Sequence, residues 1–344
     1  MILHRHHASD VAADSSGSRA ERPSRARTVL GGLLGAAAAL VLLGPRPAVP
    51  AAPPVPELPG DLEGYLRARE SGVPGLRAEA AAAIEWHDSA AREPTALSVV
   101  YLHGFSADRH EIDPVPARVA EALGANAFYA RLAGRGADED ALGGVGVGDW
   151  FADAAEAMAV GRRLGDRVVV VATSTGGTLA LWMALQEGWG EDIAALVLVS
   201  PNLGLADPAA RVLTWPWGGV MVRMLLGPYR SFESRDAAHW TTRYPSRALV
   251  PMAALVREVW KADLGAVETP VLVLYSQEDT VLDSRRTVKG FERLGSEVKR
   301  LVEVTGPGDP QRHVLAGDVL SPETTDAVVD TVVAFLRELP GGGA

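Results

Sequence analysis

The sequence of 344 residues contains no cysteine. Without thiols the chain can form no disulfide bond, no cysteine-based metal site and no thiolate nucleophile, and it cannot carry a lipid on cysteine. Export is still compatible with this absence, because an exported protein needs no cysteine. The absence of cysteine therefore excludes these kinds of chemistry but does not indicate in which cellular compartment the protein works.

Positive charge is also scarce. The chain has 33 lysine and arginine residues against 43 aspartate and glutamate residues, a formal net charge of −10. No basic stripe offsets this charge, so we expect no nucleic acid as a partner. Histidines and acidic residues are not spaced along the chain as metal ligands, and the glycine-rich stretch 143–150 lacks the strand and helix of a dinucleotide fingerprint. We therefore expect no metal and no cofactor.

The first 60 residues differ from the remainder. Four arginines lie within residues 19–27, an uncharged apolar run of 16 residues follows at 29–44, and a Pro/Ala-rich linker occupies 45–60. This order is typical of an export signal or a single N-terminal anchor, and both place residues 61–344 outside the cytoplasm. A helix of this length spans about 24 Å, less than the roughly 30 Å hydrocarbon layer. Membrane association through the run and a helix of a soluble core are the alternatives to a cleaved signal.

Residues 61–344 have the composition of one large globular domain, with no linker inside it. Apolar segments predict buried strands at 97–104, 126–134, 166–174, 194–202, 270–279 and 298–306. Helical patterns lie between and after them, at 114–123, 150–164, 175–188 and 324–338. Strands that are apolar throughout and alternate with helices indicate a mostly parallel, doubly wound α/β sheet covered on both faces.

One long segment, residues 203–268, interrupts this alternation. It is too long for a loop and has few strand signals, so it predicts a helical cap inserted after the fourth of the expected strands. It is rich in tryptophan and methionine, and these side chains form either the core of the cap itself or the wall of an apolar pocket above the sheet.

The stretch VVVVATSTGGTLA, residues 168–180, predicts a strand, a tight turn and a helix. Three hydroxyl residues at a helix start are often simply a helix cap. Alternatively, Ser174 is a nucleophile presented on a strained strand-to-helix turn. Such a turn requires small residues two positions before and after the serine, and Ala172 and Gly176 meet this requirement. The backbone N–H of Thr175 would then begin the helix and face a developing oxyanion.

A serine hydroxyl needs a base, and the base needs an orienting group. His313, in a Gly/Pro-rich loop after the last expected strand, is the candidate base, and Asp279, at the end of the fifth, is the candidate acid. The order Ser, Asp, His suits a site at the carboxyl ends of a doubly wound sheet. Glu278 and Asp283 lie near Asp279 and are alternatives, although Asp283 is better placed to cap the following helix.

A second oxyanion donor should follow the first expected strand. The residues there are His103, Gly104 and Phe105, so the Phe105 N–H is the candidate donor, and Gly104 allows the backbone to approach the site closely. His103 lies on the oxyanion side of the site. We therefore expect it to pack or hydrogen-bond within its loop and not to act as the base.

At this point the chain resembles the α/β-hydrolases of the serine esterase and lysophospholipase type, similar to monoglyceride lipases and serine aminopeptidase-like hydrolases. The resemblance covers residues 85–339 and rests on the motifs YLHGFS, RLAGRG, ATSTGG, YSQEDTVLD and RHVLAGD. It implies the α/β-hydrolase fold, with the cap after its sixth strand in the usual numbering of that fold. The sequence departs from it at Ala172, where glycine is usual, and at Arg135, where relatives often carry histidine.

These residues predict a cofactor-independent serine hydrolase that cleaves a carboxylic ester through an acyl-enzyme, with an acyl or lipid-like substrate. A small-peptide aminopeptidase is the alternative within enzymes, and it would need a carboxylate in the cap, such as Glu233, Asp236 or Glu258, to hold the amine of the peptide. A catalytically silent hydrolase scaffold that serves as a binding module is the alternative outside enzymes.

Overall fold

The computed structural model describes residues 25–339. The chain divides into two units, Met1–Gly44 and Pro45–Ala344. In the first unit, helix α1 covers Arg25–Leu42. Across residues 25–339 none of the helices combines the length and the apolarity that crossing a membrane requires. Export or membrane anchoring through the N-terminal run stays a prediction.

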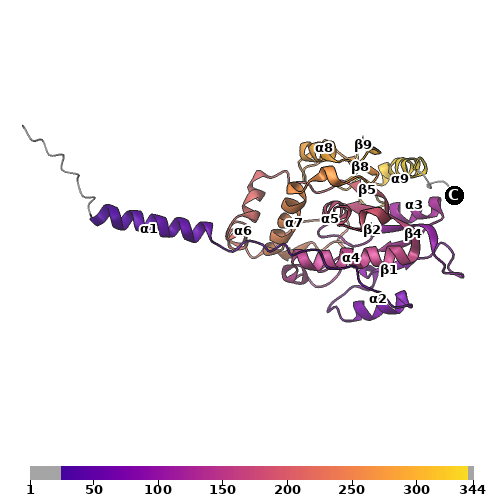
Figure 1. Ribbon diagram of the computed structural model, residues 1–344, viewed down its shortest axis with the longest axis horizontal. Coiled ribbons are helices and arrows are strands. Elements are labelled where there is room, and N and C mark those ends of the chain that lie inside the picture. Colours follow the sequence, from indigo (N-terminus) through magenta and orange to yellow (C-terminus); the bar gives the residue numbers. More distant parts are fainter. Residues whose placement is uncertain (1–24, 340–344) are drawn as a thin grey trace, which may run out of the picture. The chain divides into compact units, whose positions relative to one another are not determined.

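A seven-stranded sheet forms the centre of the second unit, in the order β1-β3-β2-β4-β5-β8-β9 (Figure 1). Six strands are parallel, and only the edge strand β1 runs antiparallel to its neighbour β3. The strands are β1 Ala83–Glu85, β2 Thr95–Leu102, β3 Asn126–Tyr129, β4 Gly165–Thr173, β5 Ile193–Val199, β8 Val271–Tyr275 and β9 Lys299–Glu303. The predicted parallel sheet is thus confirmed, and β1 is the strand that the apolar pattern missed, because it has only three residues.

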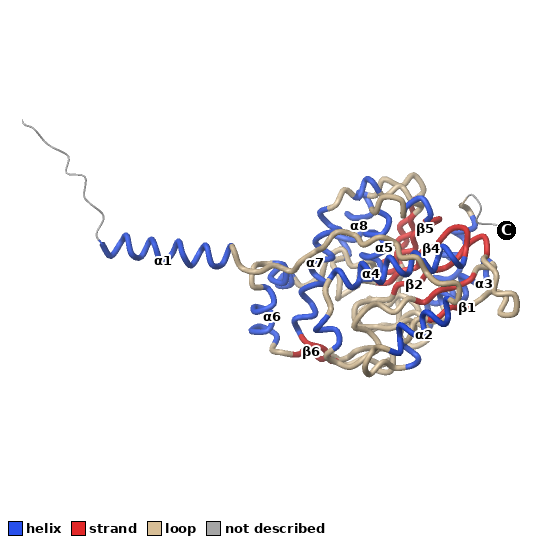
Figure 2. The backbone as a smooth tube through the Cα atoms, turned by 60° about the horizontal axis from the view of Figure 1, so that its bottom comes forward, coloured by secondary structure: helices blue, strands red, loops and turns tan. Residues whose placement is uncertain are grey.

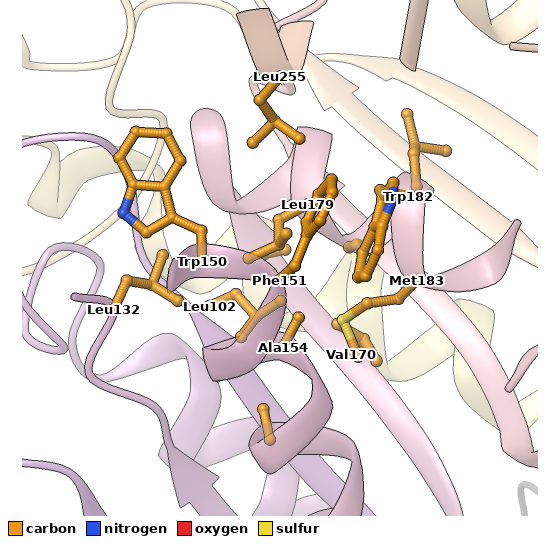
Figure 3. Packing of buried hydrophobic residues seen from close by; sticks show 14 of the residues in the cluster. Leu102, Leu132, Trp150, Phe151, Ala154, Val170, Leu179, Trp182, Met183 and Leu255 are labelled. Carbon is orange, nitrogen blue, oxygen red and sulfur yellow. The ribbon is translucent and has the colours of Figure 1, made fainter. Parts of the chain in front are cut away.

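Alternate valines of β4 supply two separate cores, one on each face of the sheet. Val169 and Val171 pack with α3 and α9, whereas Val168 and Val170 pack with α4 and α5. These helices are α3 Val115–Leu123, α4 Val147–Leu164, α5 Thr175–Ala184 and α9 Pro322–Arg337. In the second core the rings of Phe151 and Trp182 stack with centroids 3.7 Å apart (Figure 3). A buried strand thus anchors a helical layer on each side.

The cap consists mainly of helices, as predicted, but it also contains a two-stranded ribbon (Figure 2). The ribbon pairs β6, Tyr229–Ser231, with β7, Arg243–Pro245, in antiparallel fashion. Its strands are three residues long, too short to give an alternating pattern. The helical part comprises η4 Pro208–Thr214, α6 Gly218–Leu226, η5 Ser246–Ala248, α7 Leu249–Lys261 and η6 Leu264–Ala266.

The Pro/Ala-rich linker packs on the second unit. Val49, Val55 and Leu58 lie against its core, so the division of the chain at Gly44 precedes the boundary at residue 60 that composition suggested. The remaining elements complete the outer layer: α2 Leu62–Ser71, α8 Ser284–Arg293, η1 Ala78–Ala80, η2 Ala141–Gly144 and η3 Gly190–Asp192.

Candidate active site

Ser174 lies on the turn that joins β4 to α5. Its backbone has φ +52° and ψ −115°, a strained conformation for a residue other than glycine. The turn is tight because β2 passes directly beside it: a Cβ on Gly176 would lie 2.2 Å from the carbonyl oxygen of Leu102. The requirement for a small residue at position 176 thus has a direct steric cause.

Three side chains from separate loops form a continuous chain of hydrogen bonds. The Nε2 atom of His313 lies 3.0 Å from the Oγ atom of Ser174, and its Nδ1 atom lies 2.8 Å from the Oδ2 atom of Asp279. The other carboxylate oxygen of Asp279 accepts hydrogen bonds from the N–H groups of Val281 and Leu282. Asp279 therefore acts as a fixed acceptor, which favours the Nδ1–H tautomer of His313 and leaves Nε2 free to accept a hydrogen bond from the serine hydroxyl.

The surroundings of His313 favour its charged form. Burial alone would lower the pKa of the imidazole, but the hydrogen bond and charge of Asp279, together with the charges of Glu111 and Asp309, outweigh burial and raise the pKa above its ordinary value. Asp309 also accepts hydrogen bonds from the backbone N–H groups of His313 and Val314. Sequence reasoning missed Asp309, since only the folded loop brings its carboxylate under the histidine.

The two predicted oxyanion donors lie in the loop after β2 and at the start of α5. Phe105 and Thr175 line the same cavity as Ser174 and His313. Within residues 25–339 no acceptor is hydrogen-bonded to either backbone N–H, so both can donate to a bound group. Gly104 precedes Phe105, and its own N–H donates to Oε2 of Glu111 at 2.6 Å.

The structure separates Asp279 from the neighbouring acidic residues. The side chain of Glu278 is 69% exposed and pairs with Arg312, and Asp283 caps α8 by accepting from the N–H of Arg285. His103 is buried beside the oxyanion loop, where Nδ1 donates to the carbonyl oxygen of Gly104 and Nε2 accepts from the N–H of Leu132. Burial, with the charge of Arg135, lowers the pKa of His103 to about 3, so this histidine is neutral and structural, as predicted.

A cavity of about 810 Å³ opens above Ser174 between the sheet and the cap. Most of its lining from the cap is apolar, and includes Leu213, Val222, Leu226, Phe232, Trp240 and Met252. Trp240 thus belongs to the pocket wall, whereas Trp260 packs between the guanidinium groups of Arg286 and Arg293 outside it. Trp240 therefore fits the interpretation of a pocket wall, whereas Trp260 contacts α8 and Trp215 is 55% exposed. A volume of this size is in the usual range for small-molecule sites.

Comparison with known proteins identifies the family. Residues 93–307 match the family described as serine aminopeptidase, S33. The chain belongs to this family of α/β-hydrolases. The match covers the oxyanion loop, Ser174 and Asp279, and ends six residues before His313.

Relatives of this S33-family chain include lipases. The thermostable monoacylglycerol lipase of Bacillus sp. (strain H-257) is 25% identical over 209 residues, which cover 60% of this chain and 80% of the relative. A solved structure from work on the metagenome-derived lipolytic enzymes LipS and LipT is 19% identical, with a TM-score of 0.59 over 76% of this chain and 99% of that one. Monoglyceride lipase from Saccharomyces cerevisiae, solved with a substrate analog, is 14% identical, with a TM-score of 0.57 over 76% and 91%. The two solved structures establish the shared fold, and the expected α/β-hydrolase resemblance is confirmed.

Arg135, one of the two departures from the family pattern, is fully buried. Its guanidinium lies 4.9 Å from the ring centroid of Phe105 and 4.8 Å from that of Trp150, and Nη1 donates to the carbonyl oxygen of Ala133. Burial lowers the pKa of Arg135 to about 9. The arginine thus contacts the rings of both Phe105 and Trp150 through cation–π interactions.

The fold also collects three potential metal ligands that the sequence spacing did not suggest. Asp108, His110 and His239 each offer one ligand atom, and these atoms all lie within 4.8 Å of one another. The spacing of these residues along the sequence could not suggest this group, because His239 comes from the cap and lies far from Asp108 and His110 in the sequence. The guanidinium of Arg77 lies 3.1 Å from Oδ2 of Asp108, so this carboxylate already has a cationic partner.

Proposed function

We propose that the protein is a serine hydrolase that cleaves carboxylic esters with an apolar acyl group. The observation that carries this proposal is the chain of hydrogen bonds from Ser174 through His313 to Asp279 at the base of a largely apolar cavity. A nucleophile, a base and an orienting acid within hydrogen-bond distance are the parts that acyl transfer requires.

In the proposed reaction, Oγ of Ser174 attacks the acyl carbon while Nε2 of His313 takes the hydroxyl proton. The backbone N–H groups of Phe105 and Thr175 donate to the oxyanion of the tetrahedral intermediate. His313 then gives its proton to the leaving alcohol, and an acyl-enzyme remains. Water then gives a proton to His313 while its oxygen attacks the acyl carbon of the acyl-enzyme. When the bond from this carbon to Ser174 breaks, the carboxylic acid leaves and His313 returns the proton to the serine oxygen. Throughout, Asp279 stabilises the imidazolium through Nδ1–H.

The apolar lining favours an acyl chain or another lipid-like group as the part of the substrate that enters the cavity. The names of two relatives, a monoacylglycerol lipase and a monoglyceride lipase, support the same class of substrate. No charged anchor is needed to hold an acyl chain, because burial of each methylene contributes about 0.8 kcal/mol.

Small-peptide cleavage is the second candidate function. An aminopeptidase needs a carboxylate to bind the substrate amine, and among the three cap residues considered for that role Glu233 lines the cavity. Arg230 and Arg235 line it as well, so the same region carries cations that would weaken amine binding. In the cap part of the lining, Asp207 and Glu233 are balanced by Arg230 and Arg235, so this region offers no net negative charge to hold the amine of a peptide.

The deciding experiment measures hydrolysis of p-nitrophenyl esters from acetyl to palmitoyl by the full chain and by Ser174→Ala. Ser284→Ala, on α8 and outside the cavity, is the matched control. Turnover by the wild type and the control but not by Ser174→Ala supports the proposal, and the optimal chain length measures the pocket. No turnover of any ester overturns it.

Aminoacyl p-nitroanilides are the second substrate set, since their cleavage would favour the peptidase. Absence of covalent reaction of Ser174 with a fluorophosphonate, together with no turnover of either set, would indicate a silent scaffold. These outcomes separate the three functions with one protein and its two variants.

A further inference from the structure

Glu111 is a buried acidic residue that the proposed reaction does not use. It lies in the loop after β2, is 4% exposed and contributes to the lining of the active-site cavity. Its Oε2 atom accepts a hydrogen bond from the N–H of Gly104 at 2.6 Å and another from the hydroxyl of Tyr101 at 3.2 Å. The same tyrosine oxygen lies 3.2 Å from Oγ1 of Thr173. One carboxylate oxygen thus joins β2, the oxyanion loop and the end of β4.

The two ends of this network adjoin the two proposed oxyanion donors. Gly104 directly precedes Phe105 in the loop, and Thr173 precedes Ser174 and Thr175 at the turn. The donors come from different segments of the chain, and an oxyanion site works only if both N–H groups point to one place. Glu111 and Tyr101 supply a direct link between the two segments.

We propose that Glu111 is a positioning residue that holds the Phe105 and Thr175 N–H groups in register for the oxyanion. The inference rests on the proposed ester hydrolysis and names a residue required for it. Glu111 touches no reacting atom in this scheme. It acts through the Gly104 peptide on one side and through Tyr101 and Thr173 on the other.

The packing around Gly104 agrees with this role. A Cβ at position 104 would lie 2.6 Å from Oε1 of Glu111, so the carboxylate occupies the space that any other residue would need. The glycine at position 104 thus leaves the space in which the carboxylate of Glu111 reaches the backbone of the loop. A carboxylate that only filled a gap would not need its oxygen aimed at a backbone N–H at 2.6 Å.

The charge of Glu111 also reaches His313. Burial raises the pKa of Glu111 to about 7, although the hydrogen bond from Gly104 and the charge of His313 oppose this rise. The carboxylate in turn helps to raise the pKa of His313. Three other titratable groups interact with Glu111 through charge or a hydrogen bond: Tyr101, Asp108 and Arg135. Since the charge of each group acts on the pKa of the other, their protonation is coupled and shapes the acid limb of the pH–rate profile.

The test uses Glu111→Gln, Glu111→Ala and Tyr101→Phe, with kcat, KM and the pH profile of kcat/KM as readouts. The amide oxygen of Glu111→Gln can still accept both hydrogen bonds, whereas Glu111→Ala accepts none. Glu85 and Tyr129 form a matched pair at the edge of the sheet, where the hydroxyl of Tyr129 donates to Oε2 of Glu85 at 2.9 Å. Glu85→Ala and Tyr129→Phe are therefore the controls for loss of a tyrosine–carboxyl contact.

We expect Glu111→Ala to lower kcat by about 10²-fold or more with KM nearly unchanged, since loss of one oxyanion donor costs about 10²- to 10³-fold. Tyr101→Phe lowers kcat less, and Glu111→Gln restores kcat to within about tenfold of the wild type. In Glu111→Gln the acid limb of kcat/KM moves to lower pH, because the charge that raises the His313 pKa is gone. The two controls leave kcat and the pH profile unchanged.

Equal kcat values in Glu111→Ala, Tyr101→Phe and their controls would overturn the inference, as would a pH profile of Glu111→Gln identical to that of the wild type. If Glu111→Ala fails to fold, Tyr101→Phe and Glu111→Gln still decide. A wild type that hydrolyses no ester is a distinct outcome, because it removes the proposed function and this inference with it.

Discussion

The catalytic edge of the sheet and the cap above it differ in which kind of side chain they bury. Ser174, His313 and Asp279 are almost fully buried, and each has a defined hydrogen-bond partner. On α6 of the cap, Met224 is 79% exposed and Leu225 is 67% exposed. The polar side chains of the catalytic site are thus enclosed, while two large apolar side chains of the cap are exposed, the reverse of the usual distribution.

This difference in burial indicates that the sheet edge and the cap determine different properties of the protein. Parallel strands in register bring the ends of β4 and β8 to one edge, so the sheet itself fixes the distances between the loops that carry Ser174 and Asp279. The cap joins the loops at that edge through backbone pairing, such as the bridges of Ala107 with Trp240 and Leu205 with Leu282. We infer that the sheet edge determines the chemistry and that the cap determines which substrates reach it.

The largest expected effect tests the catalytic edge. Asp279→Asn keeps the size of the side chain but permits the wrong imidazole tautomer, and we expect kcat to fall about 10⁴-fold, as it does when the acid of a serine-protease triad becomes an amide. Glu278→Gln, one residue away and exposed, should leave kcat unchanged. Steady-state kinetics on one ester measures both, and equal losses would show that the assignment of the acid is wrong.

The sequence was sufficient for the parts of this edge that depend on chain order. An apolar run followed by small and hydroxyl residues predicts the turn at Ser174, and the loops after later strands predict His313 and Asp279. It was not sufficient for residues whose role depends on burial. Glu111 is one of several acidic residues in polar stretches, and nothing in the local sequence shows that it is buried against Gly104.

The cap was predicted less well than the sheet, for a related reason. Its ribbon has strands of three residues, and its apolar side chains divide between a pocket wall, an internal core and an exposed face. Hydrophobic composition is the same for all three surroundings. Likewise, Asp108 and His239 lie 131 positions apart, and only the docking of the cap brings them together.

A second prediction compares stability across pH. The pKa of Glu111 is raised from 4.5 to about 7, so the native state binds more protons than the unfolded state between these values. The free energy of unfolding therefore falls as pH rises from about 4.5 to about 7, and Glu111→Gln lacks this loss. The free energy of unfolding of the variant should therefore rise, relative to that of the wild type, by up to about 3 kcal/mol between pH 4.5 and 8.

Urea unfolding at pH 5, 6, 7 and 8 measures this difference, with Glu85→Gln as the control that should show no such trend. A stability difference that stays constant with pH would mean that Glu111 is not buried as the hydrogen bonds to Gly104 and Tyr101 imply.

A smaller effect should distinguish the two surfaces of the cap. Leu225 lines the cavity and its neighbour Met224 does not, although both are exposed on α6. Leu225→Ser should lower kcat/KM for long acyl esters by roughly 3- to 10-fold relative to the acetyl ester, since each lost methylene contact contributes about 0.8 kcal/mol. Met224→Ser should leave this ratio unchanged. A chain-length series with both variants gives the answer, and equal ratios would contradict a role of α6 in selecting the acyl group.

The smallest expected effect concerns the N-terminal unit. The residues that line the cavity all belong to the second unit, so removal of residues 1–44 should leave kcat on a short soluble ester unchanged. If the apolar run at 29–44 associates with membranes, the full chain should sediment with phospholipid vesicles more than the shortened chain does. Equal sedimentation would leave export as the remaining role for this run. A loss of kcat on removal would show instead that the first unit contributes to the activity of the hydrolase. Activity would then depend on three regions, the sheet, the cap and the N-terminal unit.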